Sequence, residues 1–320
     1  MTDIESPNPW PELPALADWQ ATVDTVHMWS QMVGKIRLEL GPWINHSWGN
    51  ALYVTTRGLT TSPIPYQGRS FAIDFDFVSH ALAIRTSDGH ERAFALRPMT
   101  VAAFYRQLMD TLDELGIHVD IFTRPVEVEV AIPFERNTSD ASYDAEAMQR
   151  FWQALVQADR VLTAFRARYL GKGSPVHLFW GSFDLAVTRF SGRTAPKHPG
   201  GVPNCPDWVM QEAYSHELYS AGFWAGTGLG EAAFYAYAYP TPEGFARHPV
   251  QPAAAYYHER LGEFVLPYAA VRSADAPDDA LLAFLQSTYE AAAETGDWDR
   301  AVLDYPVDTF VTGPKGSVAS

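Results

Sequence analysis

Four segments of the chain place apolar residues three or four positions apart, the spacing that forms one apolar face on an α-helix. They cover residues 17–36, 100–116, 145–170 and 278–296. In the second segment Thr100 precedes the first apolar residue and Gly116 follows the last one, as expected for the cap and the end of a helix. We therefore expect four long helices.

Shorter segments alternate apolar with polar residues, as strands with one buried face do. In residues 126–132, the alternation VEVEVAI predicts inward valines with Glu127 and Glu129 outward. Residues 81–96 are predicted to form a hairpin that turns at Gly89. The remaining predicted strand segments are residues 51–59, 70–78, 176–190, 216–224, 232–239 and 262–271.

The predicted elements follow the same order in both halves of the chain: helix, antiparallel strands, helix. We therefore expect an α+β fold with two lobes, residues 10–136 and 144–300, each a mainly antiparallel sheet packed with helices. The polar segment 135–144 is the predicted boundary. Residues 301–320 lack core periodicity, and we expect them to form a mobile tail.

Two ten-residue segments favour an internal duplication. WGNALYVTTR from Trp48 and WGSFDLAVTR from Trp180 share four residues at equivalent positions. A duplicated unit and two unrelated α+β lobes both remain open, because four matches in ten also arise by chance. Arg57 and Arg189 each follow a threonine in these segments, and we expect at least one of them to pair with a carboxylate or carbonyl inside the fold.

Composition limits the classes of protein to which the chain can belong. Of its 320 residues 47% are hydrophobic, enough for a large core, and no run approaches the roughly 20 apolar residues that a membrane span needs. The net charge is -15, so the chain repels nucleic-acid phosphates. Cys205 is the only cysteine, which excludes an intrachain disulfide and favours a reducing compartment. We expect a soluble, cytoplasmic protein without nucleic-acid or membrane partners, whose oligomeric state the sequence leaves open.

Several longer motifs are similar to those of a known family. They include VHMWSQMVGKIRLEL, LYVTTRGLTTSPIPY, VHLFWGSFDLAVTRFSGR and EAYSHELYSAGFW. These motifs resemble an uncharacterised bacterial family, a domain of unknown function called DUF5996, from about Trp10 to Arg300. The resemblance implies a bacterial cytoplasmic setting, and it brings no activity, cofactor or catalytic residue with it.

The common catalytic signatures are absent from the sequence, including the nucleotide loops G-x-G-x-x-G and G-x-x-x-x-G-K-[ST], the zinc motif H-E-x-x-H and the nucleophile motif G-x-S-x-G. Candidate chemistry therefore rests on histidines near carboxylates, which bind metals or exchange protons near neutral pH. Each histidine taken alone is more simply explained as a hydrogen-bonded structural residue. The histidines in or beside predicted elements are His27, His46, His80, His177 and His216.

The predicted strand over residues 182–190 has two different faces. The face expected to meet the core carries Phe183, Leu185, Val187 and Arg189. The opposite face is small and polar, which makes it the best predicted wall of a ligand pocket, and it carries Ser182, Asp184, Ala186 and Thr188. Further along, one face is formed by three tyrosines and fits either a pocket for a planar ligand or a half-exposed outer surface: Tyr235, Tyr237 and Tyr239.

We place the predicted site between the strand segments 176–190 and 216–224. Adjacent antiparallel strands commonly pair, which would gather five polar residues around one pocket roofed by the proline-rich loop 194–206. Arg189 would hold an anionic group, and His216 is favoured over Glu217 because neighbours in a regular strand point to opposite faces. The predicted catalytic residues are His177, Asp184, Arg189 and His216, and the predicted metal ligands are His177, His216 and Glu217.

Two function classes remain open. The favoured one is a small-molecule enzyme with a histidine and carboxylate site in the second lobe, for which a divalent metal is an open cofactor. The alternative is a non-catalytic ligand-binding or protein-interaction module that uses aromatic faces. Arg193, Lys197 and His198 in the loop favour an anionic ligand. Converging histidines and carboxylates would favour the enzyme, and dispersed histidines with a broad aromatic patch would favour the module.

Overall fold

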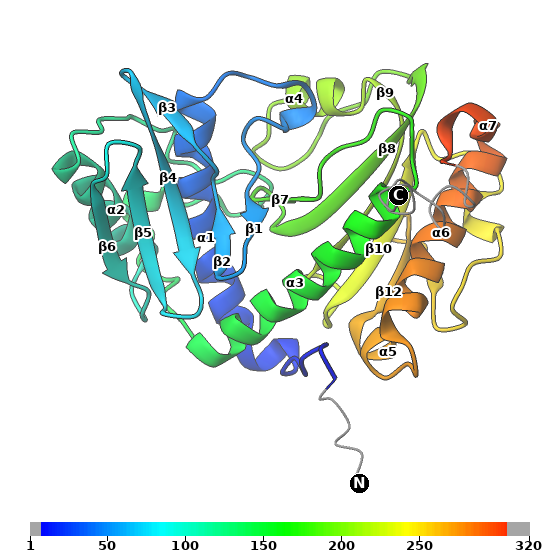
Figure 1. Ribbon diagram of the computed structural model, residues 1–320, viewed down its shortest axis with the longest axis horizontal. Coiled ribbons are helices and arrows are strands. Elements are labelled where there is room, and N and C mark those ends of the chain that lie inside the picture. Colours follow the sequence, from blue (N-terminus) through cyan, green and yellow to red (C-terminus); the bar gives the residue numbers. More distant parts are fainter. Residues whose placement is uncertain (1–7, 306–320) are drawn as a thin grey trace, which may run out of the picture.

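The computed structural model describes residues 8–305, which form an α+β fold with two six-stranded antiparallel sheets and seven helices (Figure 1). The predicted fold class is therefore confirmed. In Figure 1 the first sheet lies on the left, the second lies on the right, and α1 (Leu16–Leu40) runs between them. Within residues 8–305, no helix is both long and apolar enough to cross a membrane.

The first sheet is built from residues 53–95. Its strand order is β1 (Tyr53–Val54), β2 (Gly58–Thr60), β4 (Arg69–Asp76), β5 (Ala81–Thr86) and β6 (Glu91–Ala95), and β3 (Ile64–Tyr66) also pairs with β4. The β5–β6 hairpin turns at Gly89 as predicted, and the φ of +88° at this residue suits glycine. Phe71, Ile73 and Phe75 of β4 are buried, so their alternation sets the face that meets the core.

Helices α1 and α2 cover the buried face of the first sheet. α2 (Val101–Glu114) begins where predicted, since the Thr100 hydroxyl accepts a hydrogen bond of 3.1 Å from a backbone N–H three residues further on. Phe104 of α2 stacks on Trp29 of α1, with ring centroids 4.6 Å apart, and on Phe75 of β4 at 6.4 Å. Aromatic packing therefore ties both helices to this sheet.

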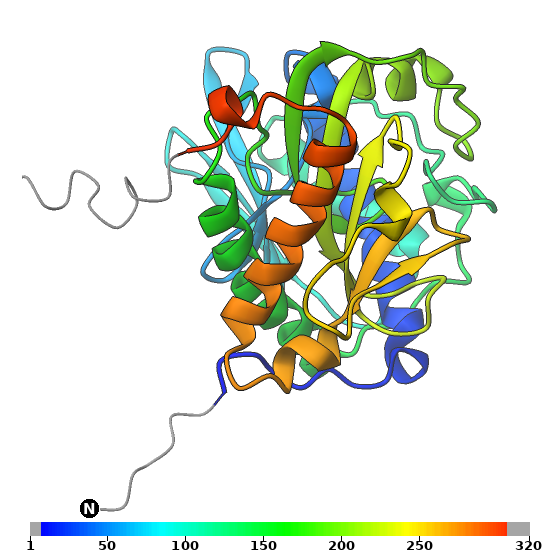
Figure 2. The same cartoon turned by 90° about the vertical axis from the view of Figure 1, so that its right-hand side faces the viewer.

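The second sheet is covered on one face by the two long helices α3 (Ala145–Arg166) and α6 (Pro277–Thr295) (Figure 2). Its strand order is β7 (His177–Phe179), β8 (Asp184–Thr194), β9 (His216–Trp224), β10 (Ala233–Tyr239), β12 (Glu263–Pro267) and β11 (Tyr256–His258). The short helices are α4 (Asp207–Ala213), α5 (Tyr268–Arg272) and α7 (Arg300–Leu303). The sheet face opposite α3 and α6 is the one that carries the cavity described below.

One hydrophobic cluster contains residues of both halves. Leu52, beside β1, and Leu178 of β7 exchange two backbone hydrogen bonds, of 2.9 and 2.7 Å, which join the edges of the two sheets. At Gly34 of α1 a Cβ atom would lie 2.1 Å from the Trp180 ring, so this glycine lets α1 pack closely on the second half. The boundaries of the two lobes stay a prediction, and residues 137–144 form an irregular segment directly before α3.

Four predicted strand segments differ from the structure. Residues 51–59 contain β1 and the start of β2, which pair across a bend at residues 56–57. Residues 176–190 contain β7 and most of β8, which pair across a turn at residues 180–183, where Phe183 has a φ of +58°. Residues 126–132 form no strand: Val130 is 77% exposed and Glu127 has a φ of +58°. Their backbone bonds to the Gln31 side chain of α1 and to the Pro203 carbonyl instead of to a neighbouring strand. In the segment 262–271, the strand ends at Pro267 and the chain turns into α5.

The predicted tail and the predicted duplication are only partly visible in the structure. Residues 306–320 lie outside the described part of the chain, whereas the start of the tail is packed, with Leu303 buried and its carbonyl accepting the Leu170 N–H at 2.7 Å. The duplication stays a prediction. Its paired segments differ in structure, since Arg57 lies in a bend after the two-residue β1 and Arg189 lies inside the 11-residue β8.

Candidate functional site

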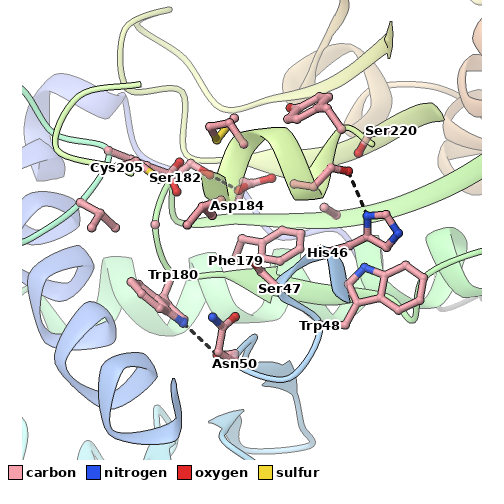
Figure 3. A pocket seen from close by; sticks show the side chains of 18 of the residues that line it. His46, Ser47, Trp48, Asn50, Phe179, Trp180, Ser182, Asp184, Cys205 and Ser220 are labelled. Atoms are coloured by element: carbon pink, nitrogen blue, oxygen red, sulfur yellow. Dashed lines mark hydrogen bonds between the residues drawn. The ribbon is translucent and has the colours of Figure 1, made fainter. Parts of the chain in front are cut away.

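A cavity of about 420 Å³ lies against the face of the second sheet that α3 and α6 leave free (Figure 3). Such a volume is typical of sites for small organic molecules, which span roughly 300–1,000 Å³. α4 and the end of the loop before it form another wall, together with residues 43–50 and 122–127. Alternate residues of three strands make the sheet wall: Asp184, Ala186, Thr188, Phe190, Leu218, Ser220, Tyr235 and Tyr237.

The predicted division of β8 into two faces is confirmed. The small polar face lines the cavity, and Leu185, Val187 and Arg189 on the other face are buried beneath α3 and α6. The tyrosine face of β10 also turns to the cavity, since Tyr235 and Tyr237 both line it. Side-chain alternation in two neighbouring strands therefore builds most of this wall.

Asp184 is the most buried carboxyl group of the cavity. Its side chain accepts a hydrogen bond of 2.5 Å from the Ser182 hydroxyl (Figure 3). It accepts another from the Tyr235 hydroxyl. Tyr235 reaches Asp184 across the intervening strand β9 because Gly222 lies between them: a Cβ atom there would lie 2.5 Å from the Tyr235 hydroxyl oxygen. A glycine in β9 therefore makes room for the contact.

A second carboxyl group, Glu127, approaches from the irregular residues 122–127, which follow α2. The Gln31 side chain, fully buried in α1, donates to the Val126 carbonyl and accepts the Val126 N–H, each at 2.8 Å. The Glu127 N–H donates to the Pro203 carbonyl at 2.8 Å. A Cβ atom at Gly181 would lie 2.0 Å from Glu127 Oε1, so the carboxyl group rests directly on the turn that leads to Ser182 and β8.

The environment of the two carboxyl groups disfavours their charged forms. Desolvation raises the pKa of Asp184, and the Ser182 and Tyr235 hydroxyls partly counter this. Glu127 lines the cavity and is itself an exposed residue, with many protein atoms around its carboxyl group. Desolvation and then the negative charge of Asp184 raise the pKa of Glu127 to about 7, whereas Ser182 lowers it. Glu127 therefore changes its charge near neutral pH.

Lys35 is the buried cation of the cavity. It lies on α1 with a relative exposure of 5%, and its ammonium group is 5.3 Å from the Phe122 ring centroid and 5.8 Å from that of Trp180. Across residues 8–305 it has no hydrogen bond and no carboxylate within 4.0 Å. Desolvation lowers the pKa of Lys35 to about 8, and the Cys205 thiol acts in the opposite direction. Most Lys35 side chains are therefore charged at neutral pH.

Aromatic side chains line the cavity and extend to the surface. Trp43 and Trp208 are 43% and 54% exposed, and their rings meet edge to face with centroids 5.1 Å apart. Phe122 is 69% exposed. Because these exposed rings also line the cavity, we place its mouth among them. A ligand that enters passes flat apolar surfaces before it reaches the carboxyl groups.

His46 joins α4 to the segment at residues 43–50. Its backbone N–H donates to the Glu212 carboxylate at 2.8 and 2.9 Å. Its ring Nδ1 donates to the Ala213 carbonyl at 3.0 Å, the bond drawn as a dashed line at His46 in Figure 3. Nε2 is then the acceptor of a 2.8 Å hydrogen bond from Lys172. Desolvation lowers the pKa of His46, so the neutral ring holds α4 over the cavity.

Comparison with known proteins gives one finding. A model of a family of unknown function, DUF5996, matches residues 10–305, nearly the whole chain. The chain belongs to the DUF5996 family. No curated protein and no solved structure matches it. Membership in this family implies no activity. The chemistry of the cavity must therefore be inferred from the residues of this DUF5996 chain.

Of the five residues predicted to share one pocket, only Asp184 lines the cavity of this DUF5996 member. His177 pairs with Ala186 near the start of β8, and both nitrogens of its buried ring lack a hydrogen-bond partner in the described residues. His216 pairs with Thr194 at the other end of β8. The expected convergence of the two histidines is therefore corrected: β7 meets the beginning of β8, and β9 starts opposite its end.

Arg189 and Glu217 also lie away from the cavity. Arg189 donates to the Phe165 carbonyl and lies 3.5 to 4.8 Å from the ring centroids of Phe165, Tyr289 and Tyr169. The prediction that Arg57 or Arg189 pairs inside the fold is thereby confirmed, but Arg189 does not line the cavity. Glu217 binds Arg193 at 2.7 Å.

The predicted metal ligands do not come together either. Nowhere in residues 8–305 do three His, Cys, Asp or Glu side chains gather in an arrangement that could hold a metal ion. The proline-rich loop does reach the cavity, since Asn204, Cys205 and Pro206 line it. We therefore assign the candidate chemistry to the carboxyl groups under this loop.

Sequence reasoning missed Glu127 and Lys35. Glu127 was expected on the outer face of a strand, although Pro125 and Pro133 bound that segment and disfavour a central strand. Lys35 lies within the otherwise apolar sequence MVGKI. A charged residue among apolar ones is the local sign that the charge lies on a buried helix face. Both residues reach the cavity through tertiary packing.

Proposed function

We propose that this protein is a small-molecule enzyme in which Glu127 and Asp184 carry out proton transfer on a ligand held in the cavity. The observation that carries the proposal is the approach of two carboxyl groups on the wall of an aromatic cavity, with Ser182 between them. Neither forms an ion pair with a basic side chain in residues 8–305. Asp184 is also buried, whereas carboxyl groups that serve only the fold are usually solvated or paired with a cation.

The two carboxyl groups have different roles in this proposal. Asp184 accepts hydrogen bonds from the Ser182 and Tyr235 hydroxyls, which favour its charged form. Its charge helps to raise the pKa of Glu127 to about 7, so Glu127 is protonated in a large fraction of molecules at neutral pH. A group in this state both accepts and donates protons, as a general acid–base catalyst must. Isomerisation, hydration and elimination are reactions that this pair can serve.

The proposal predicts proton exchange with a bound ligand. A thermal-shift screen of small organic molecules selects ligands, which are then incubated with the protein in D₂O and followed by mass spectrometry. We expect the wild type to incorporate deuterium into a ligand or to convert it. Glu127→Gln should still bind the ligand but lose the rate by about 10²–10⁴-fold, the usual contribution of a general acid–base group.

Glu129→Gln is the matched control, because Glu129 is exposed and does not line the cavity. It should exchange deuterium at the wild-type rate. If Glu127→Gln exchanged as fast as the wild type, Glu127 would not be the acid–base group.

Binding without catalysis is the second candidate, and two observations favour it: His177 and His216 lie at opposite ends of β8, and the aromatic rim is exposed. Trp43, Trp208 and Phe122 would suit capture of an apolar molecule whether or not a reaction follows. Ligands that shift the melting temperature but never exchange deuterium, at any pH between about 5 and 9, would favour this alternative over the enzyme.

A further inference from the structure

Lys35 lacks the partner that a buried ammonium group needs. The group has three N–H donors and no acceptor capacity, yet it forms no hydrogen bond or ion pair within the described residues. The Phe122 and Trp180 rings, at 5.3 and 5.8 Å, contribute a cation–π attraction that leaves the donors unused. Because Lys35 lines the cavity, an acceptor that enters can complete its hydrogen bonding.

Other buried or basic groups near the cavity are already engaged. Arg37 donates to the Ala51 carbonyl, and Lys172 donates to His46. Arg189 is buried on the opposite face of the sheet, where the Phe165 carbonyl accepts from it. Lys35 is therefore the cation of this wall that remains available to a ligand.

Charge would orient a bound molecule in the cavity. Lys35 lies against Trp180 and Phe122, and Asp184 accepts a hydrogen bond from Ser182. Glu127 rests on Gly181, next to Trp180, and, like Lys35, acts on the Cys205 thiol. An anionic group is attracted to the lysine and repelled by Asp184, so the uncharged part of the same molecule is directed toward Asp184.

We propose that the cavity takes a small ring-bearing carboxylate, whose carboxylate pairs with the Lys35 ammonium group while its ring packs among the aromatic walls. This inference rests on the proposed use of the cavity for a small molecule and names the class of that molecule. A carboxylate is preferred to a phosphate because one lysine matches one negative charge, and phosphate sites usually add arginines or several backbone N–H groups.

The test compares 1-naphthoate with its neutral analogue 1-naphthamide, using tryptophan fluorescence and calorimetry to measure affinity. We expect the wild type to bind naphthoate at least about tenfold more tightly than the amide, as a charge-assisted hydrogen bond provides. Lys35→Met should remove that preference and leave amide binding nearly unchanged, and Lys35→Arg should restore it. Lys197→Met is the control, since Lys197 is exposed on the loop and does not line the cavity.

Two results would overturn the inference. One is equal wild-type affinity for naphthoate and the amide, a comparison that does not depend on how any variant folds. The other is tighter binding of 1-naphthyl phosphate than of naphthoate. A carboxylate preference without deuterium exchange would instead contradict the proposed acid–base function and leave this inference intact.

Discussion

Replacing Tyr235 with phenylalanine removes one hydroxyl group and leaves the ring in place. That hydroxyl donates to Asp184, and both side chains are only 8% exposed. Hydrogen bonds to charged groups contribute about 1.5–3 kcal/mol to protein stability. We therefore expect Tyr235→Phe to lower the free energy of unfolding by about 2 kcal/mol at a pH high enough for Asp184 to be charged.

The cost of Tyr235→Phe should shrink as the pH falls. Desolvation raises the pKa of Asp184 in the folded protein, and the Tyr235 hydroxyl counters this by stabilising the charged form. Loss of the hydroxyl raises that pKa further, so the folded variant holds the proton more tightly than the folded wild type. The difference in stability is therefore fully present above both folded-state pKa values and is lost as Asp184 becomes protonated.

Urea unfolding followed by tryptophan fluorescence, repeated at steps across the pH range in which the protein stays folded, measures both effects. Tyr237→Phe is the matched control because the Tyr237 hydroxyl pairs at 2.8 Å with the hydroxyl of Tyr214. A hydrogen bond between neutral groups should contribute about 1 kcal/mol at each pH. Equal losses for the two variants, or a Tyr235→Phe loss that does not change with pH, would refute the reasoning.

Three further predictions follow from the packing. Gly34→Ala should lower the free energy of unfolding by about 1–3 kcal/mol, because the added Cβ would lie 2.1 Å from the Trp180 ring. This loss should exceed the gain from the better helix propensity of alanine. Urea unfolding measures the change, and an unchanged or higher free energy of unfolding would contradict the close packing of α1. Arg189→Ala should lower the free energy of unfolding by about 3 kcal/mol, because the side chain packs against three aromatic rings, and Arg189→Met should lower it less. Calorimetric unfolding of both variants measures these losses. A larger loss for Arg189→Met would show that the guanidinium charge contributes more than the packing. Trp43→Ala and Trp208→Ala should change the free energy of unfolding by no more than about 0.5 kcal/mol, because both rings are exposed. Both variants should bind 1-naphthamide more weakly than the wild type in fluorescence titrations. Unchanged binding would show that neither ring contacts the ligand on its way into the cavity.

Local sequence patterns predicted much of the wall of the cavity. Alternation in residues 182–190 separated Asp184 and Thr188 from Leu185 and Val187, and the structure places these two sets on opposite faces of β8. This worked because the side-chain direction in a strand depends only on the parity of the residue number. The four long helices and the hairpin at Gly89 followed from equally local signals.

The partners across the cavity could not be predicted in the same way. His177 and His216 seemed to meet because their strands flank one loop, but the 11-residue β8 holds them at its two ends. Glu127 reaches the cavity because the Gln31 side chain binds the backbone at Val126. Contacts of this kind depend on how helices, loops and strands pack, and alternation along one segment carries no information about them.

Carbon-13 NMR titration of the side-chain carboxyl groups tests the acid–base site most directly, with Glu127→Gln used to assign the Glu127 signal. We expect Glu127 to titrate near pH 7 in the wild type, far above the ordinary glutamate value of 4.5, because of desolvation and the charge of Asp184. In Asp184→Asn the Glu127 pKa should fall, since the negative charge is gone. A wild-type Glu127 that titrates near 4.5, or one whose pKa does not respond to Asp184→Asn, would contradict the assignment of these two residues as a coupled acid–base pair.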